Sequence, residues 1–366
     1  MWGERLGDLR NTAVRSAGFR RLAKRLPLFR SVARRESRAL FDLMAGFVYT
    51  QTLLACTEAG VFDALTAGPQ SVETLAERAN LSTSSAERLL GAAASLDLVE
   101  PRSGGRYALG RLGAALSGEP GLSAMIEHHR LLYDDLADPL GVLREGRGPR
   151  LSAFWGYARA PGEAGESQAY SALMAATLPL LTDEIFTVCR PRRHRRLLDV
   201  GGGHGVFAEA AAARAPRLDV ALFDLPEVAG QAKARLDAAG LGERVTVHGG
   251  SFLSDPLPRG ADLISLIRIL HDHDDEAARR LLGAVREAAA PGATILIAEP
   301  LAEARGAEPM GEAYFGWYLT AMGGGRPRSA ATLSRMLAEA GFTEVRVHPS
   351  RMPVIAGLIT ARSPKS

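Results

Sequence analysis

The pattern of apolar and polar positions changes near Arg190. Beyond it, short apolar runs alternate with amphipathic segments, which predicts a mostly parallel sheet covered by helices on both faces. The seven expected strands are Arg196–Val200, Asp219–Asp224, Arg244–His248, Asp262–Leu270, Ala293–Glu299, Glu344–His348 and Ala356–Ala361. Few residues separate the last two, which indicates an antiparallel hairpin. The second part of the chain, residues 190–366, is therefore expected to be an α/β domain.

The first half has the pattern of a small helical domain. The expected elements are two helices in Leu40–Leu65, separated at its glycines, helices starting at Ser71 and Ser84, and strands at Leu98–Glu100 and Arg106–Leu109. Glu87 completes a capping box with Ser84. This order predicts a winged-helix domain over residues 39–118. Residues 119–189, mostly helical with a polar loop at Ala160–Glu166, are expected to connect it to the sheet.

A winged helix can read DNA, but a DNA reader needs cations on its second helix to meet phosphates and bases. Here that helix offers Arg88 beside Glu87. We therefore expect dimerisation or a roof over the substrate site, and no nucleic-acid partner.

The net charge of +3 hides an uneven distribution. Residues 1–40 hold eleven basic against three acidic residues, so this end carries +8 and the remainder −5. A basic, partly amphipathic arm over residues 1–38 can lie on an anionic membrane, with a solvated tail or a nucleic-acid arm as alternatives.

No apolar run is expected to span a membrane and no secretory signal is apparent. Two cysteines, expected as core thiols, fit a reducing cytoplasm. Through the basic arm, we expect peripheral contact with the inner or photosynthetic membrane.

A glycine-rich turn follows the first strand of the α/β part. Asp199 precedes Gly201 and Gly203 by two and four positions, and a dinucleotide fingerprint would need a third glycine where Val206 stands. An acid at this place suits a ligand that carries an ammonium and a sulfonium better than a pyrophosphate. The alternative is a turn without a ligand.

Two further strand ends supply candidate ligand contacts. Asp224 ends the second strand near the offset at which an acid receives ribose hydroxyls, in either a nicotinamide or an S-adenosylmethionine site. After the third strand, Phe252 offers an aromatic face for adenine, with a core position as the alternative.

His271 and Glu299 follow the fourth and fifth strands. Because ligands bind at the carboxyl ends of parallel strands, both residues are expected at the same edge of the sheet as the ligand of the glycine-rich turn. An imidazole oriented by a carboxylate is the arrangement of a general base. A satisfied histidine without a catalytic role is the alternative, and no metal site is expected.

These residues resemble the caffeate and acetylserotonin O-methyltransferases, which have a winged-helix dimerisation domain ahead of a Rossmann-like methyltransferase fold. Segments at Phe41–Tyr49, Gly249–Leu257, His271–Asp274 and Met310–Phe315 are similar to the bacterial hydroxyneurosporene or demethylspheroidene O-methyltransferases of carotenoid synthesis. The resemblance implies S-adenosylmethionine as cofactor, an apolar hydroxycarotenoid as substrate and a homodimer.

Carried across by position, the resemblance implies a role for each candidate residue. Asp224 and the following Leu225 would lie at the donor ribose, Gly201 along the donor, Ser251 and Phe252 beside adenine, and Arg268 at the donor carboxylate. His271 would be the base and Glu299 its flanking acid, while a second flanking acid falls near Pro327 and is absent. Ser251 replaces a more usual aspartate.

Three other functions remain open. A C-methyltransferase of bacteriochlorophyll synthesis would share the fold but need no alcohol base. An O-methyltransferase of a polyketide or phenol would share the donor residues. A winged-helix regulator would bind the donor without turnover.

Overall fold

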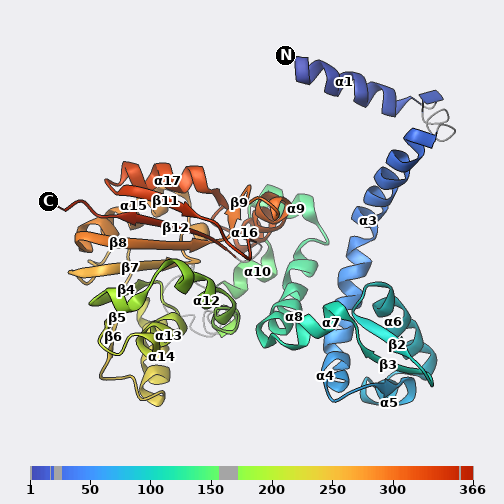
Figure 1. Ribbon diagram of the computed structural model, residues 1–366, viewed down its shortest axis with the longest axis horizontal. Coiled ribbons are helices and arrows are strands. Elements are labelled where there is room, and N and C mark those ends of the chain that lie inside the picture. Colours follow the sequence, from blue (N-terminus) through green and yellow to red (C-terminus); the bar gives the residue numbers. More distant parts are fainter. Residues whose placement is uncertain (1, 17, 20–26, 156–171, 354–355, 366) are drawn as a thin grey trace. The chain divides into compact units, whose positions relative to one another are not determined.

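In the computed structural model, seven strands form one sheet in the order β11-β12-β8-β7-β4-β5-β6 (Figure 1). They are β4 (Arg196–Val200), β5 (Asp219–Asp224), β6 (Val245–Gly249), β7 (Ala261–Ile267), β8 (Ala289–Glu299), β11 (Thr343–His348) and β12 (Gly357–Arg362). The first five run parallel, and β12 runs antiparallel to both β8 and β11. The predicted α/β fold with a terminal hairpin is confirmed.

Helices cover both faces of this sheet with apolar side chains. One face packs against α12 (Pro179–Val188), α13 (Val206–Arg214) and α14 (Pro226–Ala238), and the other against α15 (Asp275–Ala288) and α17 (Ala330–Glu339). In α15 the buried residues recur at helical spacing, as in Ala278, Leu281, Leu282 and Val285. The Asp274 side chain caps this helix by accepting a hydrogen bond from the Ala277 N–H.

A third apolar cluster joins helices from two distant parts of the chain. It includes α8 (Pro120–Asp135), α9 (Pro139–Glu145), α10 (Pro149–Phe154), the π-helix η4 (Met310–Phe315) and α16 (Gly316–Met322). The buried Asp135 accepts hydrogen bonds from the N–H groups of Arg150 and Leu151, at 2.9 and 2.8 Å, and so caps α10. The short elements η2 (Pro191–Arg193), η3 (Leu270–Asp272), β9 (Leu301–Ala302) and β10 (Arg328–Ser329) complete this half.

The amino-terminal half is helical with one small sheet, as predicted. Its elements are α1 (Trp2–Arg15), α3 (Pro27–Glu58), α4 (Val61–Thr66), β1 (Gln70–Ser71), α5 (Val72–Arg78), α6 (Thr83–Ser95), β2 (Val99–Arg102), β3 (Arg106–Leu109) and α7 (Arg111–Ser117). Ser71 caps α5 as expected. The predicted capping box at Ser84 is wrong, because Ser82 caps α6 through the Ser85 N–H.

The longest helix, α3, differs most from expectation. It continues through Gly46, where a break was predicted, because one glycine lowers helix stability without ending a helix. Its side chains Leu40, Phe41, Leu43, Met44, Phe47 and Val48 are exposed at helical spacing and form what we call the α3 stripe. By length and composition alone, Arg30–Glu58 is apolar enough to cross a membrane, which corrects the expectation of no such run.

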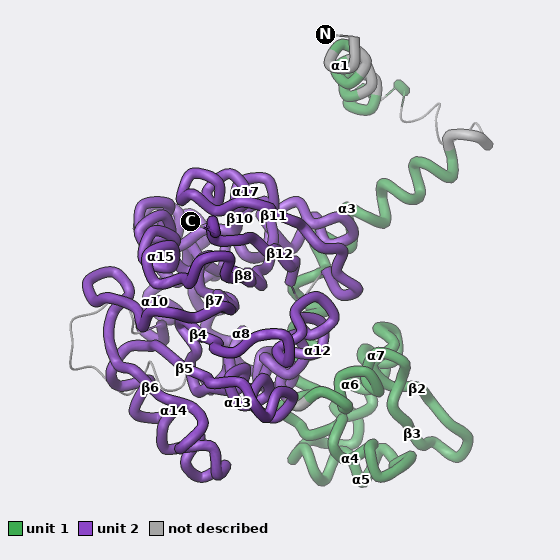
Figure 2. The backbone as a smooth tube through the Cα atoms, turned by 60° about the vertical axis from the view of Figure 1, so that its left-hand side comes forward, with its two compact units in different colours: residues 1–119 green, residues 120–366 purple. Residues whose placement is uncertain are grey.

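The structure describes residues 2–16, 18–19, 27–155, 172–353 and 356–365. The polar loop predicted at 160–166 and residues 20–26 of the arm lie outside them. Contacts divide the chain into two units, Met1–Glu119 and Pro120–Ser366 (Figure 2). The predicted arm boundary at residue 38 falls inside α3.

Candidate active site

The glycine turn after β4 forms one wall of a pocket at the carboxyl edge of the sheet. Gly201 has a φ of +68°, and a Cβ there would stand 2.6 Å from the Ile269 side chain, so a larger residue would be strained and would displace Ile269. Gly203 has a φ of +54° and open space where a Cβ would be. Both glycines line the pocket, which we call the donor pocket, and present bare backbone to it.

Asp224, at the end of β5, is fixed to this turn. One carboxylate oxygen accepts a hydrogen bond from the Gly203 N–H and the other from the Leu225 N–H, each at 2.7 Å. Burial raises the pKa of Asp224 to about 6, although both N–H groups oppose the shift. Asp224 and Leu225 line the donor pocket, as the sequence predicts.

Asp199 lies behind the pocket wall rather than among the lining residues. Its Oδ1 accepts a hydrogen bond from the Ser265 hydroxyl at 2.6 Å, whereas the buried Oδ2 has no hydrogen-bond partner among the described residues. Burial raises the pKa of Asp199 to about 7, with a further contribution from Asp224. An unsatisfied buried carboxylate oxygen beside the glycine turn is the kind of group that a cationic ligand satisfies.

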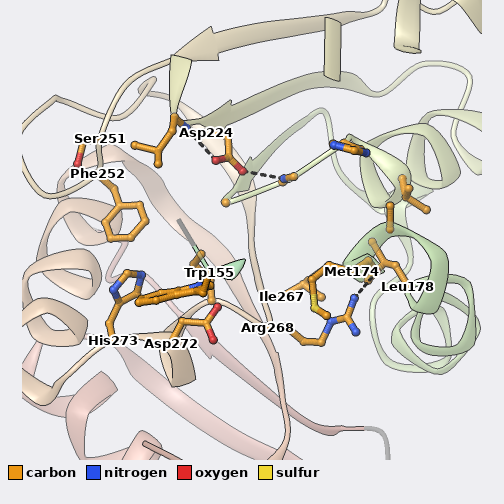
Figure 3. Close-up of a pocket in the computed structure, with 18 of the residues that line it drawn as sticks. Trp155, Met174, Leu178, Asp224, Ser251, Phe252, Ile267, Arg268, Asp272 and His273 are labelled. Atoms are coloured by element: carbon orange, nitrogen blue, oxygen red, sulfur yellow. Dashed lines mark hydrogen bonds between the residues drawn. The ribbon is translucent and has the colours of Figure 1, made fainter. Parts of the chain in front are cut away.

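Ser251, Phe252 and Arg268 also line the donor pocket. Phe252 lies on one side with Asp272 and His273, and Arg268 lies on the other with Met174 (Figure 3). The Phe252 and His273 rings meet edge to face at 5.1 Å. Phe252 is half-buried, so one part packs in the core and another faces the pocket.

The Arg268 guanidinium is held by the segment that precedes α12. It donates hydrogen bonds to the Thr177 hydroxyl at 2.8 Å and to the Met174 carbonyl at 2.6 Å. Arg268 also has a φ of +52°, a strained conformation for a non-glycine residue that is typical of functional sites. The role predicted for it at the donor carboxylate stays a prediction.

His271 and Glu299 meet at the same edge of the sheet. Nδ1 of His271 hydrogen-bonds one carboxylate oxygen of Glu299. The other oxygen accepts the N–H groups of Ile269 and Leu270, at 2.9 and 2.8 Å. Glu299 therefore fixes both the imidazole ring and the backbone that carries it.

A second carboxylate contacts His271, and sequence reasoning missed it. Nε2 of His271 lies 3.1 Å from Oδ1 of Asp272, which lines the donor pocket. Sequence resemblance placed a second acid near Pro327, where none stands; the 3-10 turn η3 instead folds the next residue back onto the ring. Burial alone would lower the pKa of His271, but Asp272 and Glu299 outweigh burial and raise it to about 10.

Arg328 holds the turn that carries His271. Its buried guanidinium donates to the carbonyl oxygens of Leu270 and His273, at 2.6 and 2.7 Å, and to the Asp275 carboxylate. Gly325 packs against the same turn, since a Cβ there would stand 2.1 Å from the His271 carbonyl oxygen. The glycine run before Arg328 was the available sequence signal for this brace.

An aromatic cluster adjoins His271. The ring centroids of His271 and Phe315 lie 6.2 Å apart, and Phe315 in turn contacts Tyr314 and Tyr318. Nε2 of His128 lies 2.8 Å from the Tyr318 hydroxyl, and Nε2 of His129 lies 2.7 Å from the Tyr314 hydroxyl. We call these two pairs, with Phe315, the aromatic wall. Burial lowers the pKa of both histidines, to about 4 for His128, so the pairs are uncharged.

These residues fit S-adenosylmethionine. Asp224 can receive ribose hydroxyls, Phe252 can contact the adenine face, and the unsatisfied Asp199 oxygen lies beside the glycine turn. The described residues contain no group of His, Cys, Asp or Glu that could hold a metal ion.

The chain matches two family models, an O-methyltransferase dimerisation domain at residues 41–118 and an O-methyltransferase domain at residues 136–343. It is 42% identical to the demethylspheroidene O-methyltransferase of Cereibacter sphaeroides, over 97% of this chain and 96% of that protein. Identity to the Rhodobacter capsulatus protein of the same name is 40%, over 92% and 85%.

Among solved structures, human N-acetylserotonin methyltransferase in complex with S-adenosylmethionine is similar. It is 27% identical and has a TM-score of 0.74, covering 90% of this chain and 98% of that one. The chain therefore belongs to the S-adenosylmethionine-dependent O-methyltransferases, with a dimerisation domain ahead of the catalytic domain.

Proposed function

We propose that this enzyme transfers a methyl group to a hydroxyl of a hydroxycarotenoid, a long apolar polyene of the demethylspheroidene type. The observation that carries the proposal of an alcohol acceptor is the buried His271 imidazole, held between Glu299 and Asp272, of which Asp272 lines the donor pocket. The acceptor class rests on identity, which is 42% to a demethylspheroidene O-methyltransferase and 33% to the mouse acetylserotonin O-methyltransferase.

Bound in the donor pocket, S-adenosylmethionine would supply a methyl group already activated by its sulfonium. The protein then has to align the acceptor oxygen with the methyl carbon and remove one proton. His271 accepts that proton as the carbon–oxygen bond forms, because an alcohol is far less acidic than imidazolium and does not ionise beforehand. Glu299 stabilises the resulting positive charge through Nδ1.

Asp272 and Glu299 together make His271 a stronger base than a free imidazole. The same two charges mean that His271 carries a proton at neutral pH, since they raise its pKa to about 10. The neutral, reactive form therefore becomes more abundant as pH rises. A base of this strength matches a weakly acidic alcohol better than an acidic phenol.

The aromatic wall supports an apolar acceptor. Each of its imidazole and hydroxyl groups pairs with another, so an acceptor placed against these rings would meet no unpaired imidazole or hydroxyl group of the wall. A polar acceptor would lose hydrogen bonds to water against such a surface, and a polyene would not.

The proposal is tested with labelled S-adenosylmethionine and a membrane pigment extract, followed by identification of the labelled product. A methyl ether of a hydroxycarotenoid supports it. Label in a chlorin ring, or in a phenol with no carotenoid product, would favour a C-methyltransferase or a phenol O-methyltransferase instead. Donor binding with no turnover would favour a regulator.

The dimerisation domain indicates a homodimer. We propose that a second copy covers the α3 stripe, whose six large apolar side chains are 56 to 81% exposed in the single chain. Contiguous apolar surface of this kind is uncommon on a monomer and is typical of a subunit contact.

We also propose that the enzyme is cytoplasmic and that the basic arm holds it at the inner or photosynthetic membrane. Arg34, Arg35 and Arg38 are exposed on the first part of α3 and precede the α3 stripe directly. Each cation near an anionic bilayer contributes about 1 kcal/mol. The proposed substrate resides in lipid, so an enzyme at that surface meets it without crossing water.

A further inference from the structure

A second hollow, of about 510 Å³, lies at the other end of the sheet from the donor pocket. The register of β8 and β12 locates it. Gly357 pairs with the catalytic-edge residue Glu299, whereas Arg362 pairs with Thr294 five positions earlier on β8. Arg362 and Thr294 line the hollow, together with the end of α12 and side chains of β11. None of the residues assigned above to the methyl donor or to the acceptor lies at this edge.

The hollow is strongly basic. Four arginines line it, Arg190, Arg193, Arg346 and Arg362, against one acid, Glu344. Arg346 and Glu344 form only a loose pair at 3.9 Å, with both side chains largely exposed. The Arg362 guanidinium donates to the Thr294 hydroxyl at 2.8 Å and to the Gly292 carbonyl at 3.2 Å, which orients it without neutralising it.

Arg190 and Arg193 are cations of the hollow that the fold does not use. They belong to the run Arg190–Arg196, which holds five arginines. Two others serve the structure, since Arg196 pairs with Asp219 at 2.8 Å and Arg192 donates to the Arg214 carbonyl at 2.6 Å. By contrast, neither the Arg190 nor the Arg193 side chain makes a hydrogen bond or ion pair with any residue that the structure describes.

Two histidines in the hollow respond to this charge. Burial lowers the pKa of His348 and the Arg346 guanidinium lowers it further. Burial also lowers the pKa of His194, where Arg362 adds to the effect and Asp262 opposes it. The cationic side chains of the hollow come from β11, β12 and the segment that precedes β4.

We propose that this hollow binds a phosphate-bearing anion, with Arg190 and Arg193 as its main contacts and Arg346 and Arg362 completing the site. Guanidinium groups match phosphate oxygens with paired N–H donors, and an anion between four of them would offset their mutual repulsion. A soluble phosphate ester and the phosphate of a lipid headgroup offer the same chemistry.

The test uses the full-length protein and calorimetry at low salt, with pyrophosphate as the probe. The double variant Arg190→Ala, Arg193→Ala is compared with Arg195→Ala, Arg217→Ala, which removes the same charge from exposed positions outside the hollow. The first is expected to bind about tenfold more weakly, and the second within about twofold of the parent. Both should keep methyl transfer, which reports that they are folded.

Equal losses in the two variants would mean that pyrophosphate responds to overall charge, and would overturn the site, as would no binding by the parent. A second arm uses a short-chain phosphatidylglycerol below its micelle concentration. Binding of both probes with the same loss in the Arg190, Arg193 variant identifies a lipid headgroup as a fitting ligand. Binding of pyrophosphate alone identifies a soluble phosphate compound.

Discussion

Nε2 of His271 lies 3.1 Å from Oδ1 of Asp272, while Nδ1 faces Glu299. The imidazole thus contacts one carboxylate on each side, and both raise its pKa, to about 10. A base works in its neutral form, so kcat/KM is expected to rise with pH from neutral towards this pKa, well above the ordinary 6.5 of histidine.

Asp272→Asn removes one of the two charges and keeps the shape of the side chain. The alkaline rise in kcat/KM should therefore move to lower pH in this variant. Profiles of parent and variant with the same acceptor are the measurement. A parental rise centred near the ordinary histidine value, or one that the substitution leaves in place, would contradict the role of Asp272.

Asp224→Ala should weaken binding of S-adenosylmethionine by about 1.5 to 3 kcal/mol, because it removes a charged acceptor for the ribose hydroxyls. Burial raises the pKa of Asp224 to about 6, so parental affinity should also fall as pH drops below that value and the carboxylate gains a proton. Calorimetry between about pH 5 and pH 8, a range that spans this pKa, measures both the effect of the substitution and the effect of pH. Unchanged affinity in a folded Asp224→Ala protein would remove this residue from the donor site.

Arg328→Ala should lower kcat by about 100-fold while changing donor affinity little, since it releases the turn that positions His271. Arg326→Ala is the matched control. Its side chain is 61% exposed and forms an ion pair with the same Asp275, but donates no side-chain hydrogen bond to the His271 turn among the described contacts. Thermal unfolding of both variants separates misfolding from mispositioning, and a similar kcat loss in the two would count against the brace.

Deleting residues 1–38 should reduce co-sedimentation with vesicles that contain anionic lipid, and salt should weaken the binding of the full-length chain. Activity on detergent-dispersed substrate should be kept. Because residues 27–38 are the first turns of α3, oligomeric state is measured in parallel. Equal sedimentation of both forms, or none at low salt, would exclude the arm as a membrane contact.

The sequence predicted the fold because periodicity and strand ends carry most of that information. The apolar runs located all seven strands, and the glycine turn with Asp224 located the donor pocket. The predictions that were wrong concern helix boundaries inferred from a single residue. Gly46 does not end α3, and Ser82 rather than Ser84 caps α6, since a helix boundary depends on backbone geometry that several nearby serines can satisfy.

The parts of the site that sequence could not supply depend on contacts between distant residues. The turn η3 decides that Asp272 faces His271, and nothing in the sequence alone separates it from Asp274, which caps α15 instead. Arg328 reaches the same turn from 57 positions beyond His271, and His128 meets Tyr318 across 190 positions. Such pairings become visible only when the chain is folded.

The most direct test of the account is the His271→Ala variant, measured for donor affinity and for methyl transfer in one preparation. We expect methyl transfer to fall by roughly 100-fold or more, as loss of a general base predicts, with affinity for S-adenosylmethionine nearly unchanged. Glu299→Gln should lower methyl transfer by a smaller factor than His271→Ala. Methyl transfer close to the parental rate in the His271→Ala protein would show that positioning alone suffices, and would contradict the proposed removal of an alcohol proton by His271.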